Sequence, residues 1–331
     1  MKGSKQVLSN YFSILSGDRL PAFLAEAAQG IDSDLTEKTP TLWADHDTFL
    51  EAEGKTPDPG KTLIDLKIEL ARRIMESCHL CERSCGVNRL AGEKGYCKAE
   101  EARVASKFVH WGEEPDIIPS YTIFFNRCTF RCVFCQNWDI SQRNAGRCIP
   151  AEALSRDIER MAGNVRNVNW VGGEPTPNLE YILQVLRVCS APLPQIWNSN
   201  MYMSRETMTL LRGVVDVYLS DFKYGPGECG EELSDAPNYW EIVTRNHSLA
   251  NEHAEIVMRH LVMPGHVECC TKPILRWVKE NLDTSKIVVN IMDQYRPEHK
   301  AFHHEKIGRR ITHREFNEAH RFAEGLDLTL T

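Results

Sequence analysis

Short apolar runs alternate with amphipathic stretches from about residue 120 to the end of the chain. Runs rich in β-branched and aromatic residues predict six strands, at Tyr121–Phe125, Val168–Val171, Gln195–Trp197, Val215–Leu219, Glu255–Val262 and Ile287–Met292. Helical periodicity follows at residues 151–162, 179–189, 204–211, 239–251, 272–281 and 313–324. Because the strand runs are short, largely apolar and separated by helices, we expect an α/β fold with a parallel sheet, arranged as a partial (β/α)6 TIM-like barrel.

The rest of the chain predicts smaller additions to this core. Residues 1–77 indicate an N-terminal helical extension, with helical runs at Val7–Ala25 and Leu63–Ser77 and a break at Pro57–Gly60. Residues 78–119 form a small cysteine-rich metal-binding segment and a linker, residues 120–300 the β/α core, and residues 301–331 a C-terminal helical tail.

Residues with unusual chemistry lie at or just after the predicted strands. In chain order they are Cys128, Cys132 and Cys135, then Gly172-Gly173-Glu174-Pro175, Asn198 and Asn200, Asp221 and Lys223, Arg259, and Asp293-Gln294-Tyr295. Parallel β/α barrels carry their active sites on the loops that follow the strands. The sequence therefore predicts one functional site at the carboxyl ends of the strands.

Composition and charge narrow the functional classes. The chain has 331 residues with 39 basic and 46 acidic side chains, a net charge of −7 at pH 7, which argues against a general nucleic-acid binder. No apolar run approaches the ~20 residues that a membrane span needs, and residues 1–6 lack the apolar region of a secretory signal. We therefore expect a cytoplasmic protein, in which clustered cysteines stay reduced and serve as metal ligands.

Cys128, Cys132 and Cys135 share one loop with the spacing C-x3-C-x2-C. Thiolates hold iron–sulfur clusters, and three of them leave one iron of a four-iron cluster without a protein ligand. An open coordination position separates a reactive metal site from a closed structural one. On spacing alone, the alternative is a zinc knuckle that borrows a fourth cysteine.

A second cysteine set precedes the core. Cys78, Cys81, Cys85 and Cys97 follow the spacing C-x2-C-x3-C-x11-C, which is a strong metal-binding signal. Four thiolates make a closed site, and zinc and an iron–sulfur cluster both accept them. The metal therefore stays open, and the expected role is structural or electron-relaying. The remaining cysteines share no spacing and receive no metal role: Cys148, Cys189, Cys229, Cys269 and Cys270.

The cysteine triplet, followed by Gly172-Gly173-Glu174-Pro175 and by Asp221-Phe222-Lys223, resembles the radical S-adenosylmethionine (SAM) superfamily. From Cys78 to about His299 the chain looks like the group related to the pyruvate formate-lyase activating enzyme, in a branch with an N-terminal cysteine-rich segment. The resemblance implies a barrel of the radical SAM type and a [4Fe-4S] cluster at the triplet, with SAM as the ligand of the open iron. It further implies reductive cleavage of SAM to a 5′-deoxyadenosyl radical, which abstracts a hydrogen atom from a substrate.

The resemblance also implies partners and cofactor contacts. A low-potential electron donor of the flavodoxin or ferredoxin type would reduce the cluster, and the substrate stays open between a protein glycine, another protein residue and a small molecule. The residues implied to contact SAM are Gly172, Gly173, Glu174, Asn198, Asn200, Asp221, Lys223 and Arg259. A different class also stays open, a non-catalytic iron–sulfur electron-transfer or metal-binding protein.

Overall fold

The computed structural model describes residues 3–52 and 60–331. Its centre is a seven-stranded sheet in the order β1-β2-β3-β4-β5-β6-β7. The strands are β1 (Val104–His110), β2 (Ser120–Phe125), β3 (Asn167–Gly172), β4 (Gln195–Ser199), β5 (Val217–Asp221), β6 (Glu255–Leu261) and β7 (Ile287–Met292). All neighbours from β2 to β7 pair in parallel, whereas β1 is antiparallel to β2. The expected α/β fold, a partial (β/α)6 TIM-like barrel with a parallel sheet, is confirmed with β2 to β7 as its six strands, and the antiparallel β1 is an unpredicted seventh strand.

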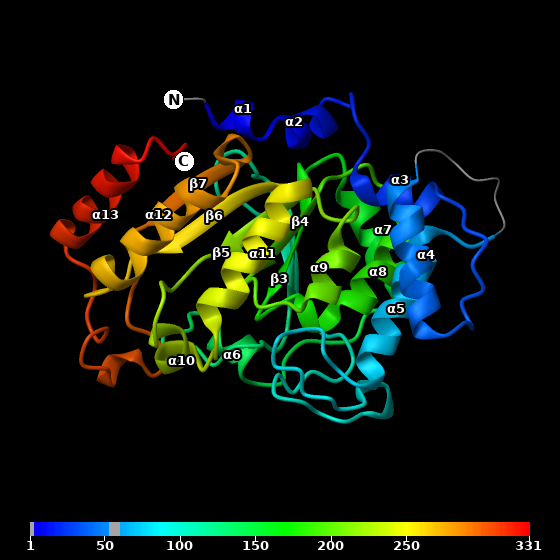
Figure 1. The fold of residues 1–331 in the computed structure, drawn as a ribbon, viewed down its shortest axis with the longest axis horizontal. Helices are drawn as coiled ribbons and strands as arrows, with labels where there is room; N and C mark the ends of the chain where they lie inside the picture. Colours follow the sequence, from blue (N-terminus) through cyan, green and yellow to red (C-terminus); the bar gives the residue numbers. More distant parts are fainter. Residues whose placement is uncertain (1–2, 53–59) are drawn as a thin grey trace.

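The helices lie on the outer face of the sheet, at both ends of its strands and beyond its edge (Figure 1). They are α1 (Ser4–Val7), α2 (Ser9–Leu15), α3 (Ala22–Ala28), α4 (Thr39–Glu51), α5 (Leu63–Glu76), α6 (Trp138–Ser141), α7 (Ala151–Met161), α8 (Leu179–Arg187), α9 (Arg205–Leu211), α10 (Cys229–Ser234), α11 (Tyr239–His253), α12 (Lys272–Asn281) and α13 (His313–Gly325). The helices expected from periodicity in the core are all present. Of the expected break at Pro57–Gly60, residues 57–59 lie outside the described residues.

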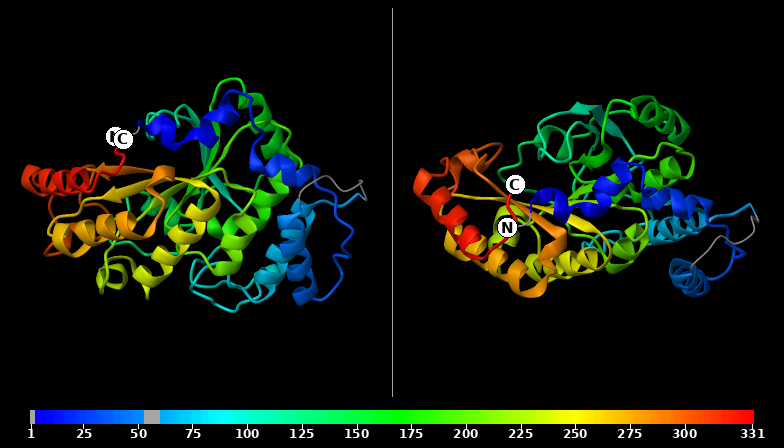
Figure 2. Two further views of the ribbon diagram at one scale, coloured as in Figure 1. Left: turned by 45° about the horizontal axis from the view of Figure 1, so that its top comes forward. Right: turned by 90° about the horizontal axis from the view of Figure 1, so that it is seen from above.

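Strand alternation divides the side chains between two faces of the sheet. On the outer face, Trp170 and Tyr218 are buried in the main hydrophobic core beneath the helices. On the inner face, a separate apolar cluster joins Val217 and Val257 to Leu8 and Tyr11 of the N-terminal segment. Helices α1 and α2 thus close the amino end of the strands. Figure 2 shows the C-terminus close to these two helices.

The opposite, carboxyl end of the strands carries the long loops. The cysteine-rich segment lies there, at the same end of the sheet as α6 and α10 (Figure 1). The carbonyl of Leu80 accepts hydrogen bonds from the backbone N–H of Ser204 (3.2 Å) and from Thr207 Oγ1 (2.8 Å), which docks this segment on the loop after β4. In the two described ranges, no helix has the length and apolar character needed to cross a membrane.

Candidate active site

One cavity opens among the carboxyl ends of the strands. It has a volume of about 210 Å³. Its lining includes all the residues predicted for the cluster and for SAM: Cys128, Cys132, Cys135, Gly172, Gly173, Glu174, Asn198, Asn200, Asp221, Lys223 and Arg259. The fold thus brings together groups that lie far apart in the sequence.

The cysteine triplet sits on the loop between β2 and α6, at one wall of this cavity. Cys128 and Cys132 are buried, and Cys135 is half-buried. Ser234 Oγ donates a hydrogen bond to Cys132 Sγ (2.8 Å), and the backbone N–H of Phe130 donates one to Cys128 Sγ (3.4 Å). Such donors stabilise sulfur that carries negative charge, as it does in a cluster.

Burial has a direct effect on these thiols. It raises the pKa of Cys128 well above its usual value and that of Cys132 to about 11, because an ionised thiol loses its hydration. The bare thiols therefore keep their protons at neutral pH. A bound cation would supply the positive charge that the thiolates need, so the donor set fits an iron–sulfur cluster.

Gly172 and Gly173 let the end of β3 approach the loop that carries the cysteines. A Cβ on Gly172, whose φ is +143°, would lie 2.1 Å from the carbonyl oxygen of Phe125, and one on Gly173 would lie 2.0 Å from that of Arg127. Side chains cannot be accommodated so close to backbone. The Gly-Gly pair is therefore required to seat the cysteine loop against β3.

Glu174 is buried, and its carboxylate is engaged by the protein. Oε1 accepts hydrogen bonds from Thr176 Oγ1 (2.6 Å) and Ser199 Oγ (2.7 Å), and Oε2 accepts one from the backbone N–H of Asn200 (3.0 Å). Asn200 in turn donates through Nδ2 to Thr129 Oγ1 (3.0 Å) in the cysteine loop. Glu174 therefore connects the ends of β3 and β4 and holds Asn200 beside the triplet.

Arg259 is the centre of a charged network across the cavity. It donates through Nε to Asp221 Oδ1 (3.1 Å), through Nη1 to Glu113 Oε2 (3.0 Å) and through Nη2 to Asn198 Oδ1 (2.5 Å). Lys223 Nζ donates to Asp221 Oδ2 (2.5 Å). Burial alone would raise the pKa of Asp221, but the charges of Lys223 and Arg259 outweigh it and hold this pKa below the ordinary value. The cavity thus keeps an ionised carboxylate between two fixed cations.

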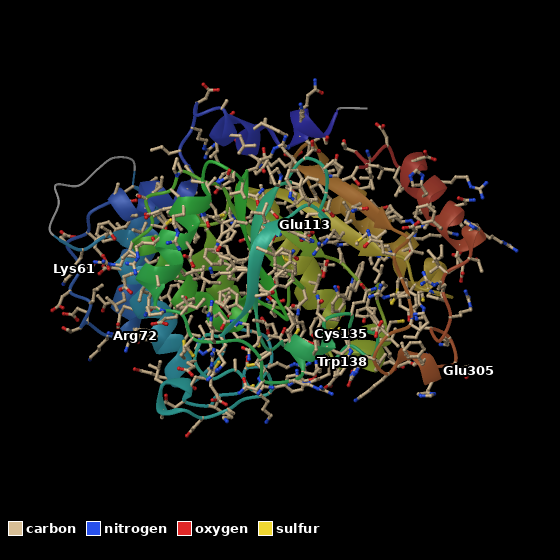
Figure 3. All side chains as sticks on the ribbon, turned by 180° about the vertical axis from the view of Figure 1, so that it is seen from behind. Lys61, Arg72, Glu113, Cys135, Trp138 and Glu305 are labelled. Carbon is tan, nitrogen blue, oxygen red and sulfur yellow. The ribbon has the colours of Figure 1, made fainter. Side chains whose placement is uncertain are left out.

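A second chamber adjoins the cavity and shares Asn198, Asp221, Lys223 and Arg259 with it. It has a volume of about 580 Å³, and its further lining includes His110, Glu113, Glu114, Asn290, Met292 and Gln294. Figure 3 shows Glu113 with Cys135 and Trp138 below it, seen from behind. Sequence reasoning gave Glu113 and Glu114 no role, because they follow β1, the strand that it missed.

The segment that carries the predicted second cysteine set is hydrogen-bonded to the loop of the triplet. The backbone N–H of Tyr96 donates to Cys85 Sγ (3.2 Å), and that of Ala99 to Cys97 Sγ (3.5 Å). Arg83 Nε donates to the carbonyl of Thr129 (3.1 Å), and Arg131 Nη2 donates to that of Tyr96 (2.5 Å). Two arginines therefore bind the cysteine-rich segment to the loop of the triplet.

Comparison with known proteins identifies the family. The model of the Radical SAM superfamily matches residues 122–278. The uncharacterized protein MJ0674 of Methanocaldococcus jannaschii is 48% identical over 275 residues, covering 81% of this chain and 80% of that protein. The chain belongs to the radical SAM superfamily. Membership implies a [4Fe-4S] cluster and SAM as cofactors of this radical SAM enzyme.

More distant relatives differ in what their names describe. The pyruvate formate-lyase 1-activating enzyme of Escherichia coli K12 is 24% identical over 152 residues, which is 44% of this chain and 61% of that enzyme. Among solved structures, Streptococcus suis SuiB bound to the precursor peptide SuiA has a TM-score of 0.49 at 13% identity, covering 87% of this chain and 59% of that one. Methylornithine synthase (PylB) has a TM-score of 0.46 at 13% identity, covering 97% of this chain and 77% of that one.

The cysteine triplet and the charged network of the cavity offer suitable groups for a [4Fe-4S] cluster and for SAM. The triplet would hold the cluster at one wall, and the remaining space lies between it and the charged network of Arg259. That network and the amides of Asn198 and Asn200 offer partners for the carboxylate, amine and ribose of SAM. These residue roles remain predictions.

Proposed function

We propose that this radical SAM enzyme cleaves SAM reductively and abstracts a hydrogen atom from a substrate in the second chamber. The observation that carries the proposal is the single cavity that joins the triplet to the charged network and opens into that chamber. A cluster held by Cys128, Cys132 and Cys135 would supply the electron for the cleavage of SAM to methionine and a 5′-deoxyadenosyl radical. The protein supplies orientation and the exclusion of water.

The chain's own residues have distinct proposed tasks. Cys128, Cys132 and Cys135, which line the cavity, would hold the cluster through three thiolates, so that one of its four irons would lack a protein ligand. Arg259 and Lys223 orient the SAM carboxylate, while Asp221 holds both cations in place. Gly172 and Gly173 expose backbone to the SAM ammonium, and Glu174 acts by positioning Asn200 and not as a free carboxylate. This last assignment follows from its full set of hydrogen bonds.

The charge of the second chamber supports a substrate that carries a positive group. Glu114 is 4% exposed, and its Oε1 accepts a hydrogen bond from Asn290 Nδ2 (2.9 Å). Within the described part of the chain, Oε2 of Glu114 has no hydrogen-bond partner. The positive charge of Arg259 acts on Glu114, but a buried carboxylate oxygen without a hydrogen-bond donor is still costly, and an amine or guanidinium of the substrate would supply that donor.

The similarity to the pyruvate formate-lyase activating enzyme favours a protein glycine as the substrate, with another protein residue or a small molecule as the alternatives. We propose that the cysteine-rich segment relays electrons from a flavodoxin- or ferredoxin-type donor, because Arg83 and Arg131 connect it to the triplet loop. Cys78, Cys81, Cys85 and Cys97 would hold this second metal centre. A cytoplasmic location is part of the proposal, since thiols stay reduced there.

Anaerobic reconstitution with iron and sulfide, followed by dithionite and SAM, tests the proposal. The wild type is expected to form 5′-deoxyadenosine, and Cys132→Ala to form none above background. Cys148→Ala is the matched control, because Cys148 is exposed and outside the cavity. A wild type with full cluster content that forms no 5′-deoxyadenosine would favour the electron-transfer alternative.

A further inference from the structure

Cys229, His266 and Cys269 come from two separate loops and meet in space. The sulfurs of Cys229 and Cys269 and a ring nitrogen of His266 all lie within 4.8 Å of one another. Across residues 3–52 and 60–331, no other three cysteine, histidine or acidic side chains gather so tightly. Cys270 Sγ lies 3.8 Å from Cys269 Sγ, although it is not within 4.8 Å of all three of these donors, and it is the candidate fourth ligand.

The hydrogen bonding of His266 presents one nitrogen for coordination. His266 is 3% exposed, and its Nδ1 lies 2.7 Å from the carbonyl oxygen of Pro264. A carbonyl can only accept, so Nδ1 carries the proton and Nε2 keeps its lone pair. Histidine ligands of metals are commonly oriented in this way, with the second ring nitrogen bonded to a carbonyl.

The local backbone conformation brings these four side chains together. The π-helical segment η3 (Val267–Thr271) contains Cys269 and Cys270, and His266 directly precedes it. The carbonyl of His266 accepts hydrogen bonds from the backbone N–H groups of Cys270 and Thr271. A Cβ on Gly225 would lie 2.1 Å from the carbonyl oxygen of Cys269. The loop after β5 therefore approaches η3 closely only because residue 225 is glycine. This approach brings Cys229 to the other ligands.

Donor spacing distinguishes a single ion from a cluster. Zn–S bonds of about 2.3 Å in a tetrahedron separate two sulfurs by about 3.8 Å, which agrees with the 3.8 Å between Cys269 and Cys270. Ligands of an iron–sulfur cube stand farther apart, because several metal atoms lie between them. The group at Cys229 is thus sized for one ion.

We propose that Cys229, His266, Cys269 and Cys270 bind one Zn²⁺ ion, a site separate from the SAM cavity and from the set at Cys78. Thiolates and imidazole are the ligands that zinc prefers, and four of them make a closed structural site. On binding, the three thiols release their protons to solvent as the sulfurs bond to the metal.

The position of this site gives the ion a structural task. Cys229 begins α10, and Ser234 at the end of the same helix donates to Cys132 Sγ. The carbonyls of Leu233 and Ser234 also accept N–H bonds from Val133 and Arg131 (2.9 and 3.0 Å). A zinc ion would anchor the start of α10 to η3, so that its end supports the triplet loop.

The test is the zinc and iron content per chain, measured by mass spectrometry on protein purified anaerobically from zinc-supplemented medium. Cys229→Ser and Cys269→Ser are each expected to lose about one zinc per chain relative to the wild type. The matched control Cys148→Ser is expected to keep it. Equal zinc content in the wild type and both variants would overturn the proposal, and so would a wild type in which Cys229 and Cys269 form a disulfide.

A second variant guards against loss of folding. His266→Cys keeps four ligands, so it is expected to retain the ion while changing its coordination from three sulfurs to four. Cobalt substitution reports this change as stronger sulfur-to-metal absorption relative to the wild type. A cobalt spectrum identical in the wild type and His266→Cys would show that His266 is no ligand and would contradict the site.

Discussion

Two groups of candidate metal ligands differ in their spacing along the chain and in their compactness in space. They are the triplet Cys128, Cys132 and Cys135 and the group of Cys229, His266 and Cys269. The triplet is contiguous in one loop, yet its thiols do not form a group within 4.8 Å among the described residues, as the second group does. The second group is spread over two loops but is compact. Spacing along one loop was therefore enough to predict the iron–sulfur site at the triplet. The proposed zinc site could not be predicted in this way, because only the fold brings its ligands together.

The largest expected effect separates the two sites by their metals. Cys132→Ala removes a cluster ligand, so we expect loss of most of the iron bound at the triplet and a drop in 5′-deoxyadenosine formation of at least about a thousandfold, consistent with loss of an essential catalytic group. Zinc content should not change. Metal analysis and product assay check this, and equal losses of iron in Cys132→Ala and Cys229→Ser would erase the distinction between the sites.

Two glycine substitutions form the next test. Gly172→Ala places a Cβ 2.1 Å from the Phe125 carbonyl, and Gly225→Ala places one 2.1 Å from the Cys269 carbonyl. Each should cost at least about 2 kcal/mol of folding free energy through steric clash. We expect Gly172→Ala to lower iron content and Gly225→Ala to lower zinc content. Gly163→Ala, where a Cβ meets nothing within 4 Å, is the control, and a reversed pattern of metal loss would contradict the assignment.

Periodicity and loop position predicted most of the fold and the gathering of the candidate site residues around one cavity. The parallel strands are buried on both faces and read as apolar runs, and their carboxyl ends necessarily meet, which groups Asn198, Asp221 and Arg259. Strand β1 was missed because it is a half-exposed edge strand with Ser106 and Lys107 in its middle. The chemistry of Glu113 was missed with it.

The proposed zinc site at Cys229, His266 and Cys269 could not be predicted from the sequence, for a different reason. Its ligands belong to two β/α units, and no spacing rule connects Cys229 to His266 and Cys269. The close approach at Gly225 and the π-helical turn decide their meeting, and neither follows from hydrophobic periodicity. The adjacent pair Cys269-Cys270 was the one local signal.

Asp221→Asn should affect the SAM cavity alone. Removing its charge leaves Lys223 and Arg259 without their shared partner, and we expect about a tenfold weaker binding of SAM, or about 1.4 kcal/mol. Because the pKa of Asp221 is held below its ordinary value, its carboxylate stays ionised at all pH values above about 4. Equilibrium binding of SAM from pH 6 to 8 should therefore show no titration of Asp221. Unchanged affinity in Asp221→Asn would remove it from the site.

Glu114→Gln tests the charge of the second chamber. L-Lysine and L-arginine at millimolar concentration are expected to raise the melting temperature of the wild type more than neutral L-norleucine does, because Glu114 Oε2 lacks a partner within the described residues. The difference should vanish in Glu114→Gln. An equal response of wild type and variant would contradict a cationic substrate group.

His260 connects the loops that frame the proposed zinc site and makes the stability of the fold depend on pH. Its ring bonds the Phe222 carbonyl and Thr271 Oγ1, both at 2.8 Å, and burial lowers its pKa from 6.5 to about 4, with Lys223 adding to the shift. The unfolded chain binds this proton more readily, so the contribution is complete above pH 6.5 and is lost as the pH falls to 4. The loss amounts to about 3 kcal/mol.

Urea unfolding of the wild type and of His260→Asn between pH 4 and 7 checks this dependence. The variant should show a shallower fall in the free energy of unfolding, since asparagine does not titrate there. His313→Asn, at an exposed position, is the control and should follow the wild type. A parallel pH dependence in His260→Asn would show that His260 does not stay neutral in the fold.

The most direct test of the central claim is electron paramagnetic resonance of the dithionite-reduced protein with and without SAM. If the triplet leaves one iron open toward the cavity, SAM should change the cluster signal in the wild type and in Cys148→Ala, and Cys132→Ala should lack that signal. Identical spectra with and without SAM, at full iron content, would contradict the account.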